Sequence, residues 1–248
     1  MANRYYQPGE ARASRVEALF NAIASRYDLI NDLQSFGLHR YWKRRMIRRA
    51  QLQPHELALD VCCVTGEIAF GLRQNQGRVL AIDFSAPMLA AASRRARHLT
   101  AVPDQPPPLF ARGDALRLPV RDASASVVTI AYGLRNLADL PLAAREFHRV
   151  TRPGGRLLVL DFGKPTAAPW RVLYFAYLRL VVPLFGKLFC GDAASYGYIL
   201  ESLEHYPAQA GIDELLRNAG WTEPHTTNIL GGIMSLTVAR KSNLKFEI

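Results

Sequence analysis

The sequence predicts an α/β fold built on a mostly parallel sheet with helices on both faces. Short apolar runs alternate with Ala-rich helical stretches from Glu56 onward, and strand–helix alternation of this kind forms right-handed βαβ units. Polar groups follow three successive apolar runs, as they do at the ligand crevice of an open parallel sheet. Of the 248 residues, 49% are hydrophobic, which is enough for the core of one full domain.

The first 50 residues precede this alternation. Residues 1–15 are polar and read as a loose tail, whereas Val16–Tyr27 and Arg40–Ala50 have apolar residues at helical spacing. The second of these helices is strongly basic. We therefore expect residues 1–50 to form an N-terminal tail and helical arm, and residues 51–248 to form the main domain.

The main domain begins with five apolar runs of strand length, separated by helical stretches or loops. The expected strands lie near residues 56–62, 78–83, 108–112, 126–132 and 155–162. The expected helices lie near residues 67–74, 86–98 and 139–150.

The end of the chain follows a different pattern. A helix over Ile212–Ala219 is closed by Gly220, and Gly231-Gly232 then separates strands near 225–230 and 233–240, which is a hairpin signal. The segment 164–208 is aromatic and aliphatic and predicts a helical substrate cap over the crevice. A seven-stranded, mostly parallel sheet ending in an antiparallel hairpin is the layout of the Rossmann-like class I S-adenosylmethionine-dependent methyltransferases.

Composition limits the partners and the compartment. The formal net charge of +10 favours an anionic partner, but no nucleic-acid-binding module accompanies it, so nucleic acid is not expected. The basic helix is either a solvated face or a docking surface for anionic lipid. Three cysteines without metal-ligand spacing indicate a reducing compartment and no metal site. No signal peptide or membrane span is evident, so we expect a cytoplasmic protein, peripheral on the membrane if the basic helix binds lipid.

The polar residues after the strands form a candidate cofactor site. Thr65 and Gly66 follow the first strand in a tight turn, where backbone amides and a hydroxyl can hold an anionic group. Asp83 follows the second strand, at the position of an acid that binds ribose hydroxyls, and Asp114-Ala115 follows the third, beside an adenine edge. Val64 is awkward in this turn, because a β-branched residue resists positive φ.

From about Phe20 to Lys241, the chain resembles the UbiE/MenG-type quinone-ring C-methyltransferases, and five stretches carry this resemblance. They are Arg26–Asp32, Gly37–Lys43, Tyr132–Asn136, Arg149–Gly155 and Ser195–Ser202, the last beginning Ser-Tyr-Gly-Tyr. The paired cysteines and the Ile-Asp-Phe-Ser run around Asp83 resemble the menaquinone and phylloquinone branch more than the ubiquinone branch. Two positions depart from the family pattern: Val64 stands where a glycine is usual, and Ala131 stands where a serine is expected.

The resemblance implies methyl transfer from S-adenosylmethionine to a ring carbon of a prenylated hydroquinone. Family cofactor positions correspond to Thr65, Asp83, Asp114 and Ala115. Arg135 is then expected to stabilise the phenolate, and Asn136 to orient the phenolate or a water. Arginine is a poor base, so the identity of a general base that removes the phenolic proton remains open. The candidates for that base are His148, His205 and Asp139.

Several alternatives stay open. Tyr132, Tyr196 and Tyr198 are expected to face the substrate ring, although the two tyrosines of the cap would also serve as simple packing residues. A second possible function is that of a divergent relative, which methylates another phenolic or polyketide ring or uses the cofactor for a different reaction. A third possibility is a non-catalytic paralogue that scaffolds a quinone-synthesis complex. The sequence does not decide between a monomer and a homodimer.

Overall fold

Seven strands form one sheet in the computed structural model, which describes residues 10–24, 26–75, 77–98, 105–190 and 194–243. The spatial order is β3-β2-β1-β4-β5-β7-β6. The strands are β1 (Leu57–Val61), β2 (Arg78–Asp83), β3 (Leu109–Arg112), β4 (Ala125–Ala131), β5 (Thr151–Phe162), β6 (Trp221–Ile229) and β7 (Met234–Lys241).

The strand pairing confirms the predicted fold. Strands β3, β2, β1, β4 and β5 pair in parallel, and β7 pairs antiparallel with both β5 and β6. The hairpin turns at Gly231 and Gly232, whose φ values of +66° and +97° suit glycine. β5 begins four residues earlier than predicted, because Thr151 already pairs with Ala125 ahead of an irregularity in the ladder.

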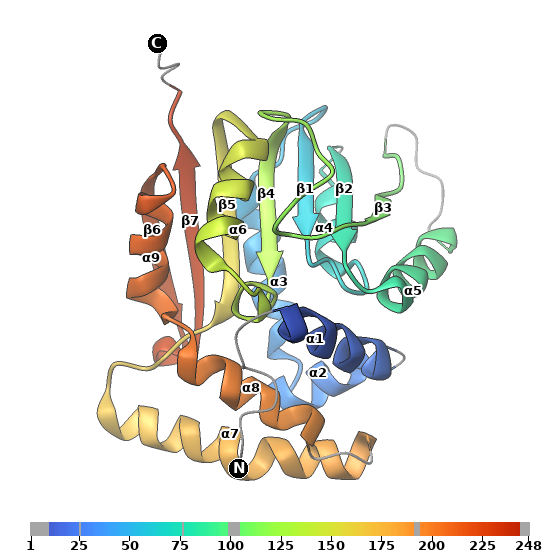
Figure 1. The fold of residues 1–248 in the computed structure, drawn as a ribbon. Helices are drawn as coiled ribbons and strands as arrows, with labels where there is room; N and C mark the ends of the chain where they lie inside the picture. The colour runs from blue at the N-terminus through green and yellow to red at the C-terminus, as the bar shows by residue number, and fades with distance from the viewer. Residues whose placement is uncertain (1–9, 25, 76, 99–104, 191–193, 244–248) are drawn as a thin grey trace.

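The helices cover both faces of the sheet and the end at which the parallel strands finish, at the bottom of Figure 1. They are α1 (Glu10–Ile23), α2 (Tyr27–Ser35), α3 (Leu38–Ala50), α4 (Glu67–Arg73), α5 (Ala86–Arg97), α6 (Leu140–Val150), α7 (Ala168–Cys190), α8 (Ala194–His205) and α9 (Ala208–Asn218). Two further short 3₁₀ turns are η1 (Leu134–Asn136) and η2 (Leu230–Gly232).

Alternating side chains of the central strands fill two separate cores. Leu59 and Val61 of β1 face a core that includes Phe147 of α6, whereas Ala58 faces a core that includes Met46 of α3. This alternation is expected of strands buried on both faces. The carboxyl ends of the parallel strands point toward α1, α2, α8 and α7, which gather at that edge (Figure 1). A ligand at the strand ends therefore lies between the sheet and these helices.

The N-terminal arm differs from its prediction in two ways. The tail was expected to extend to residue 15, but α1 already begins at Glu10; residues 1–9 lie outside the described chain. The single helix expected over Val16–Tyr27 is two helices, since α1 ends at Ile23 and α2 begins at Tyr27. Tyr27 and Ile30 are the buried residues of α2, and a helix of nine residues with two buried positions gives a weak periodic signal.

Two helices, α7 and α8, make up most of the described part of the segment 164–208, where a helical cap was expected. α7 and α8 pack against each other beside the strand ends, and α8 also contacts the turn η1 (Figure 1). α7 runs through Pro183 without ending there. Within the described residues, no helix combines the length and the apolar character needed to cross a bilayer.

Candidate active site

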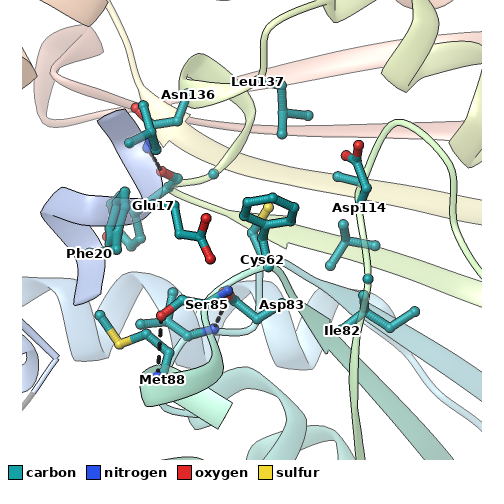
Figure 2. A pocket seen from close by; sticks show the side chains of 18 of the residues that line it. Glu17, Phe20, Cys62, Ile82, Asp83, Ser85, Met88, Asp114, Asn136 and Leu137 are labelled. Atoms are coloured by element: carbon teal, nitrogen blue, oxygen red, sulfur yellow. Dashed lines mark hydrogen bonds between the residues drawn. The ribbon is translucent and has the colours of Figure 1, made fainter. Parts of the chain in front are cut away.

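A pocket at the carboxyl ends of β1, β2, β3 and β4 brings together half of the predicted site residues, namely Asp83, Asp114, Ala115, Tyr132 and Asn136 (Figure 2). We call it the main pocket; it encloses about 920 Å³, including the space at its open mouth. Its lining comprises Val16, Glu17, Phe20, Tyr27, Val61, Cys62, Val64, Ile82, Asp83, Phe84, Ser85, Met88, Gly113, Asp114, Ala115, Leu116, Ala131, Tyr132, Gly133, Asn136, Leu137 and Ala138.

Asp83 is the most firmly held acid of the main pocket. Its Oδ2 accepts the amide of Val64 at 2.8 Å, and its Oδ1 accepts the amide of Ser85 at 2.8 Å. Burial raises the pKa of Asp83 above its usual range, although these backbone donors oppose the shift. A carboxylate has about four acceptor sites, so Asp83 can still accept hydroxyl groups from a ligand.

Asp114 and Ala115, which follow β3, also line the main pocket, and Figure 2 labels Asp114. Asp114 is exposed and its Oδ1 accepts the amide of Leu116 at 2.9 Å, whereas Ala115 is buried. This bond and the one from the Arg117 amide to the Asp114 carbonyl at 3.1 Å fix the turn that lines the pocket. The structure thus brings Asp83, Asp114 and Ala115 into one pocket, as the strand-end argument predicted.

Thr65 and Gly66 support the turn rather than line the main pocket. Gly66 has φ +81°, and a Cβ there would lie 3.0 Å from the rings of Phe70 and Phe110. Glycine is therefore favoured there both by the backbone conformation and by the packing. Thr65 Oγ1 donates to Asp28 Oδ1 at 2.8 Å and belongs to a smaller cavity on the other side of the turn.

Val64 adopts the conformation that its side chain was expected to resist. Its φ is +51°, and Cys62 in the same turn has φ +55°. The Val64 amide is held by Asp83, so the turn keeps its left-handed geometry despite the β-branched residue. A left-handed conformation costs a non-glycine residue about 1–2 kcal/mol.

This strain predicts an unusual order of stability for two variants. Val64→Gly is expected to be more stable than Val64→Ala by about 1 kcal/mol, because both remove the valine side chain but only glycine relieves the strain. Urea unfolding of both proteins measures the difference. S-adenosylmethionine should bind Val64→Gly at least as tightly as the wild type. An alanine variant as stable as the glycine variant would contradict the strain.

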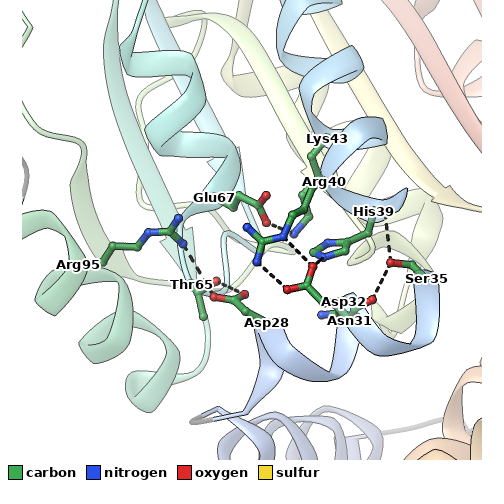
Figure 3. Close-up of polar contacts among 10 residues, drawn as sticks. All are labelled: Asp28, Asn31, Asp32, Ser35, His39, Arg40, Lys43, Thr65, Glu67 and Arg95. Carbon is green, nitrogen blue, oxygen red and sulfur yellow. Dashed lines mark hydrogen bonds and ion pairs between the residues drawn. The ribbon is translucent and has the colours of Figure 1, made fainter. Parts of the chain in front are cut away.

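A polar network joins the N-terminal helices to this turn (Figure 3). Lys43 of α3 donates to Glu67 of α4 at 2.6 Å, and Asp32 of α2 accepts from Arg40 at 2.6 Å and contacts His39 at 2.8 Å. Apart from Glu67, these residues come from the two N-terminal stretches that carried the family resemblance. Together with the bond from Thr65 to Asp28, they fix α2 and α3 against the start of α4.

Asp60 lies in the smaller cavity, which we call the side cavity, beside Lys43, Thr65 and Glu67. Its Oδ1 accepts Thr129 Oγ1 at 2.8 Å, while its Oδ2 is buried without a partner among the described residues. Burial raises the pKa of Asp60 to about 7. The folded protein therefore holds this proton well above the pH at which an unfolded chain releases it.

Asp60 should make stability depend on pH in a defined window. Since the folded state binds the proton more tightly, the free energy of unfolding falls as pH rises from about 4 to about 7. Asp60→Asn cannot titrate and lacks this contribution. The wild-type value minus the variant value, from urea unfolding, should decrease across this window and stay level above it. A constant difference would contradict the raised pKa.

Tyr132 separates the main pocket from its neighbours and has φ +61°. Its carbonyl accepts Arg135 Nη1 at 2.6 Å and Asn136 Nδ2 at 3.3 Å, and its amide donates to Leu160 at 2.7 Å. Arg135 and Asn136 were expected to act on the substrate oxygen directly. In the structure both side chains also hold the backbone of Tyr132 in its strained conformation.

Arg135 is buried, with 3% of its surface exposed. Its Nη1 pairs with Asp161 Oδ1 at 2.7 Å, its amide donates to Asp161 Oδ2 at 3.2 Å, and its guanidinium lies 4.6 Å from the ring centre of Phe162. Asp161 at the end of β5 therefore compensates the charge of Arg135. Sequence reasoning missed this acid, because it ends an apolar run without a motif of its own.

A third cavity lies beside Tyr132, and we call it the aromatic pocket. Its lining consists of Ile23, Tyr27, Ile30, Asn31, Gln34, Tyr132, Arg135, Phe162 and Ile199. Tyr27 and Tyr132 belong to both this lining and that of the main pocket. The two spaces are therefore neighbours, one at the strand ends and one beneath α2 and α8.

The three candidates for a general base have other contacts. Asp139 caps α6 by accepting the amide of Leu142 at 2.8 Å, and His148 packs edge-on against Trp221. His205 is exposed, and its Nδ1 lies 3.1 Å from the Glu201 carbonyl oxygen of its own helix. None of the three lines the described pockets. The expected roles of Tyr196 and Tyr198 fall outside the described part of the chain, since their side chains in α8 are not described.

The contribution of α1 was not predicted. Val16, Glu17 and Phe20 line the main pocket, Glu17 pairs with Arg112 at 3.1 Å, and Asn21 accepts Ser85 Oγ at 2.6 Å. The i, i+4 spacing of Val16 and Phe20 was the available signal. It indicated a helix, but the sequence gave no sign of where that helix would pack.

Comparison with known proteins identifies the family of the chain. A family model described as the ubiE/COQ5 methyltransferase family matches residues 9–241. A demethylmenaquinone methyltransferase of Desulfitobacterium hafniense is 34% identical over 236 residues, which cover 94% of this chain and 92% of that protein. A protein of the same name from Beutenbergia cavernae is 38% identical over 226 residues, or 91% of this chain and 90% of that one.

The fold is shared with solved structures. A SAM-dependent methyltransferase from Aquifex aeolicus superposes with a TM-score of 0.61, at 14% sequence identity, over 89% of this chain and 97% of that chain. This likeness supports the fold, and the family match supports the chemistry. The chain therefore belongs to the ubiE/COQ5 methyltransferase family, and it is an enzyme that uses S-adenosylmethionine as its methyl donor.

Proposed function

We propose that the protein methylates a ring carbon of a prenylated hydroquinone of the demethylmenaquinol type, as a step in quinone biosynthesis. The observation that carries this proposal is the adjacency of two pockets, which share Tyr27 and Tyr132. One has the acids of a nucleoside site, and the other has aromatic and aliphatic walls suited to a ring. The names of the relatives from Desulfitobacterium hafniense and Beutenbergia cavernae support the same acceptor.

The main pocket fits the cofactor. The free acceptor sites of Asp83 suit the ribose hydroxyls, and Asp114 with the backbone of Ala115 suits the adenine edge. Thr65 and Gly66 would maintain the turn beside which the cofactor binds. When bound, S-adenosylmethionine supplies an electrophilic methyl group, so the protein has only to align the acceptor carbon and make it nucleophilic.

The acceptor side is arranged around Tyr132. A phenolate pushes electron density onto the neighbouring ring carbon, which becomes the nucleophile. Arg135 lines the aromatic pocket, and its guanidinium is held there by Asp161. The guanidinium can donate hydrogen bonds to the phenolate while it stays protonated itself. Asn136 lines the main pocket and also holds the Tyr132 carbonyl. We assign Arg135 and Asn136 to positioning the ring wall and stabilising the phenolate.

Calorimetric titration with S-adenosylmethionine and S-adenosylhomocysteine tests the cofactor assignment. Binding of both ligands in the micromolar range is expected. A folded protein that binds neither would favour the non-catalytic paralogue. Binding without turnover of any prenylated quinol, but with turnover of another phenol, would favour the divergent relative.

We further propose that the enzyme works while attached to an anionic membrane through the outer face of α7. Leu173, Leu180 and Leu184 are 59%, 71% and 54% exposed. Their spacing of seven and four residues puts them on one face of the helix. Arg171 and Arg179 are exposed on the remaining surface of the same helix, and an apolar face combined with arginine on the polar surface is typical of helices that lie in a lipid interface.

Sedimentation with vesicles tests this attachment. Binding should be stronger to vesicles containing phosphatidylglycerol than to pure phosphatidylcholine vesicles, and should weaken with salt. Leu173→Glu with Leu180→Glu should abolish it. Leu109→Glu is the matched control, because Leu109 is 68% exposed on the edge strand β3. Equal binding of the double variant and the control would reject the α7 surface.

A further inference from the structure

Gln34 and Tyr132, which both line the aromatic pocket, each carry a polar atom without a hydrogen-bond partner in the described structure. The two atoms are Nε2 of Gln34 and the hydroxyl of Tyr132, and both are buried. A buried donor without a partner destabilises the protein, so such atoms favour a ligand that supplies the missing partner. The remaining walls are mainly apolar or aromatic, including Ile30, Phe162 and Ile199. The missing partner is therefore a polar atom on an otherwise apolar ligand.

The position of Gln34 is fixed by the cap. Tyr177 of α7 donates its hydroxyl to the Gln34 carbonyl at 2.8 Å, which joins the end of α2 to the cap helix. Tyr132 is fixed from the other side by the bonds of its carbonyl to Arg135 and Asn136. Its ring also packs edge-on against Phe162 at 5.8 Å. Both unpartnered atoms thus belong to side chains with well-supported backbones, as recognition groups require.

We propose that Gln34 and Tyr132 recognise the oxygen atoms of the acceptor hydroquinone. The Gln34 amide donates to one ring oxygen, and the Tyr132 hydroxyl bonds the ring oxygen beside the carbon that is methylated. Gln34 thereby becomes a specificity-determining residue that no motif of the sequence indicates. This inference rests on the proposed function, since it names the groups that select the substrate of the same site.

Titration with 1,4-dihydroxynaphthalene under anaerobic conditions, in the presence of S-adenosylhomocysteine, tests the proposal. Gln34→Leu and Tyr132→Phe are each expected to weaken binding of this ring about tenfold, the effect of one hydrogen bond in a buried site. The affinity for S-adenosylhomocysteine should change less than twofold. Gln34→Glu should weaken ring binding at least as much as Gln34→Leu, because a carboxylate cannot donate to the ring oxygen.

Turnover measurements separate this proposal from the function on which it rests. With a short-chain demethylmenaquinol, Gln34→Leu should raise KM about tenfold. Gln53→Leu, an exposed glutamine after α3, should behave as the wild type. Wild-type protein that does not methylate the quinol would refute the function. Wild-type turnover with unchanged KM and ring affinity in Gln34→Leu, or an equal loss of cofactor affinity, would refute the recognition role alone.

Discussion

Asp161→Asn is expected to lower the free energy of unfolding by about 3–5 kcal/mol, because it leaves the Arg135 charge buried without its counter-ion. The side chains of Arg135 and Asp161 are 2% and 1% exposed, and they are 2.7 Å apart. Water cannot replace the carboxylate at such a site. Urea unfolding of the wild type and the variant measures the loss.

Two further proteins make this prediction specific. Asp122→Asn breaks the ion pair of Asp122 with Arg149, where the aspartate side chain is 76% exposed, and should cost less than about 1 kcal/mol. Adding Arg135→Met to Asp161→Asn should recover part of the stability, since it removes the uncompensated charge. A loss in Asp161→Asn as small as that in Asp122→Asn would show that the buried pair contributes little.

Asp83→Ala is expected to weaken binding of S-adenosylmethionine about 100-fold. The variant removes the carboxylate that would accept the ribose hydroxyls, and each hydrogen bond to a charged group contributes about 1.5–3 kcal/mol. It also removes the acceptor of the Val64 and Ser85 amides, so the turn loses its anchor. Calorimetry with S-adenosylhomocysteine measures the loss on a ligand that cannot react.

The chemistry of the side chain can be separated from its effect on the turn. Asp83→Asn keeps one acceptor oxygen and should fall between the wild type and Asp83→Ala. Asp122→Ala, which removes an exposed acid outside the pocket lining, should bind as the wild type does. If a well-folded Asp83→Ala protein kept wild-type affinity, the cofactor would have to bind elsewhere.

The sheet could be predicted from the sequence because its strands and its hairpin carry local sequence signals. Strands β1 and β4 are apolar runs of strand length, and the hairpin is marked by Gly231 and Gly232 at positive φ. The strand-end residues Asp83, Asp114 and Ala115 then fall into one pocket as a consequence of parallel topology. Site residues that follow parallel strands can therefore be predicted whenever the sequence predicts the order and direction of those strands.

The parts that could not be predicted depend on long-range packing. The ion pair of Arg135 with Asp161 joins residues 26 positions apart on neighbouring elements, and the bond from Tyr177 to Gln34 joins residues 143 apart. Neither contact leaves a local pattern. Val64 shows the opposite case: its propensity argued against a positive φ, but the hydrogen bond from its amide to Asp83 outweighed that preference.

Methylation of carbon is the central claim, and one experiment tests it most directly. The protein is incubated anaerobically with S-adenosylmethionine carrying a deuterated methyl group and a short-chain demethylmenaquinol, and the product is analysed by mass spectrometry and proton NMR. The account predicts one labelled methyl group per ring, loss of one ring-proton signal and both hydroxyl groups intact. Label on a ring oxygen, or no labelled product from protein that binds S-adenosylhomocysteine, would contradict it.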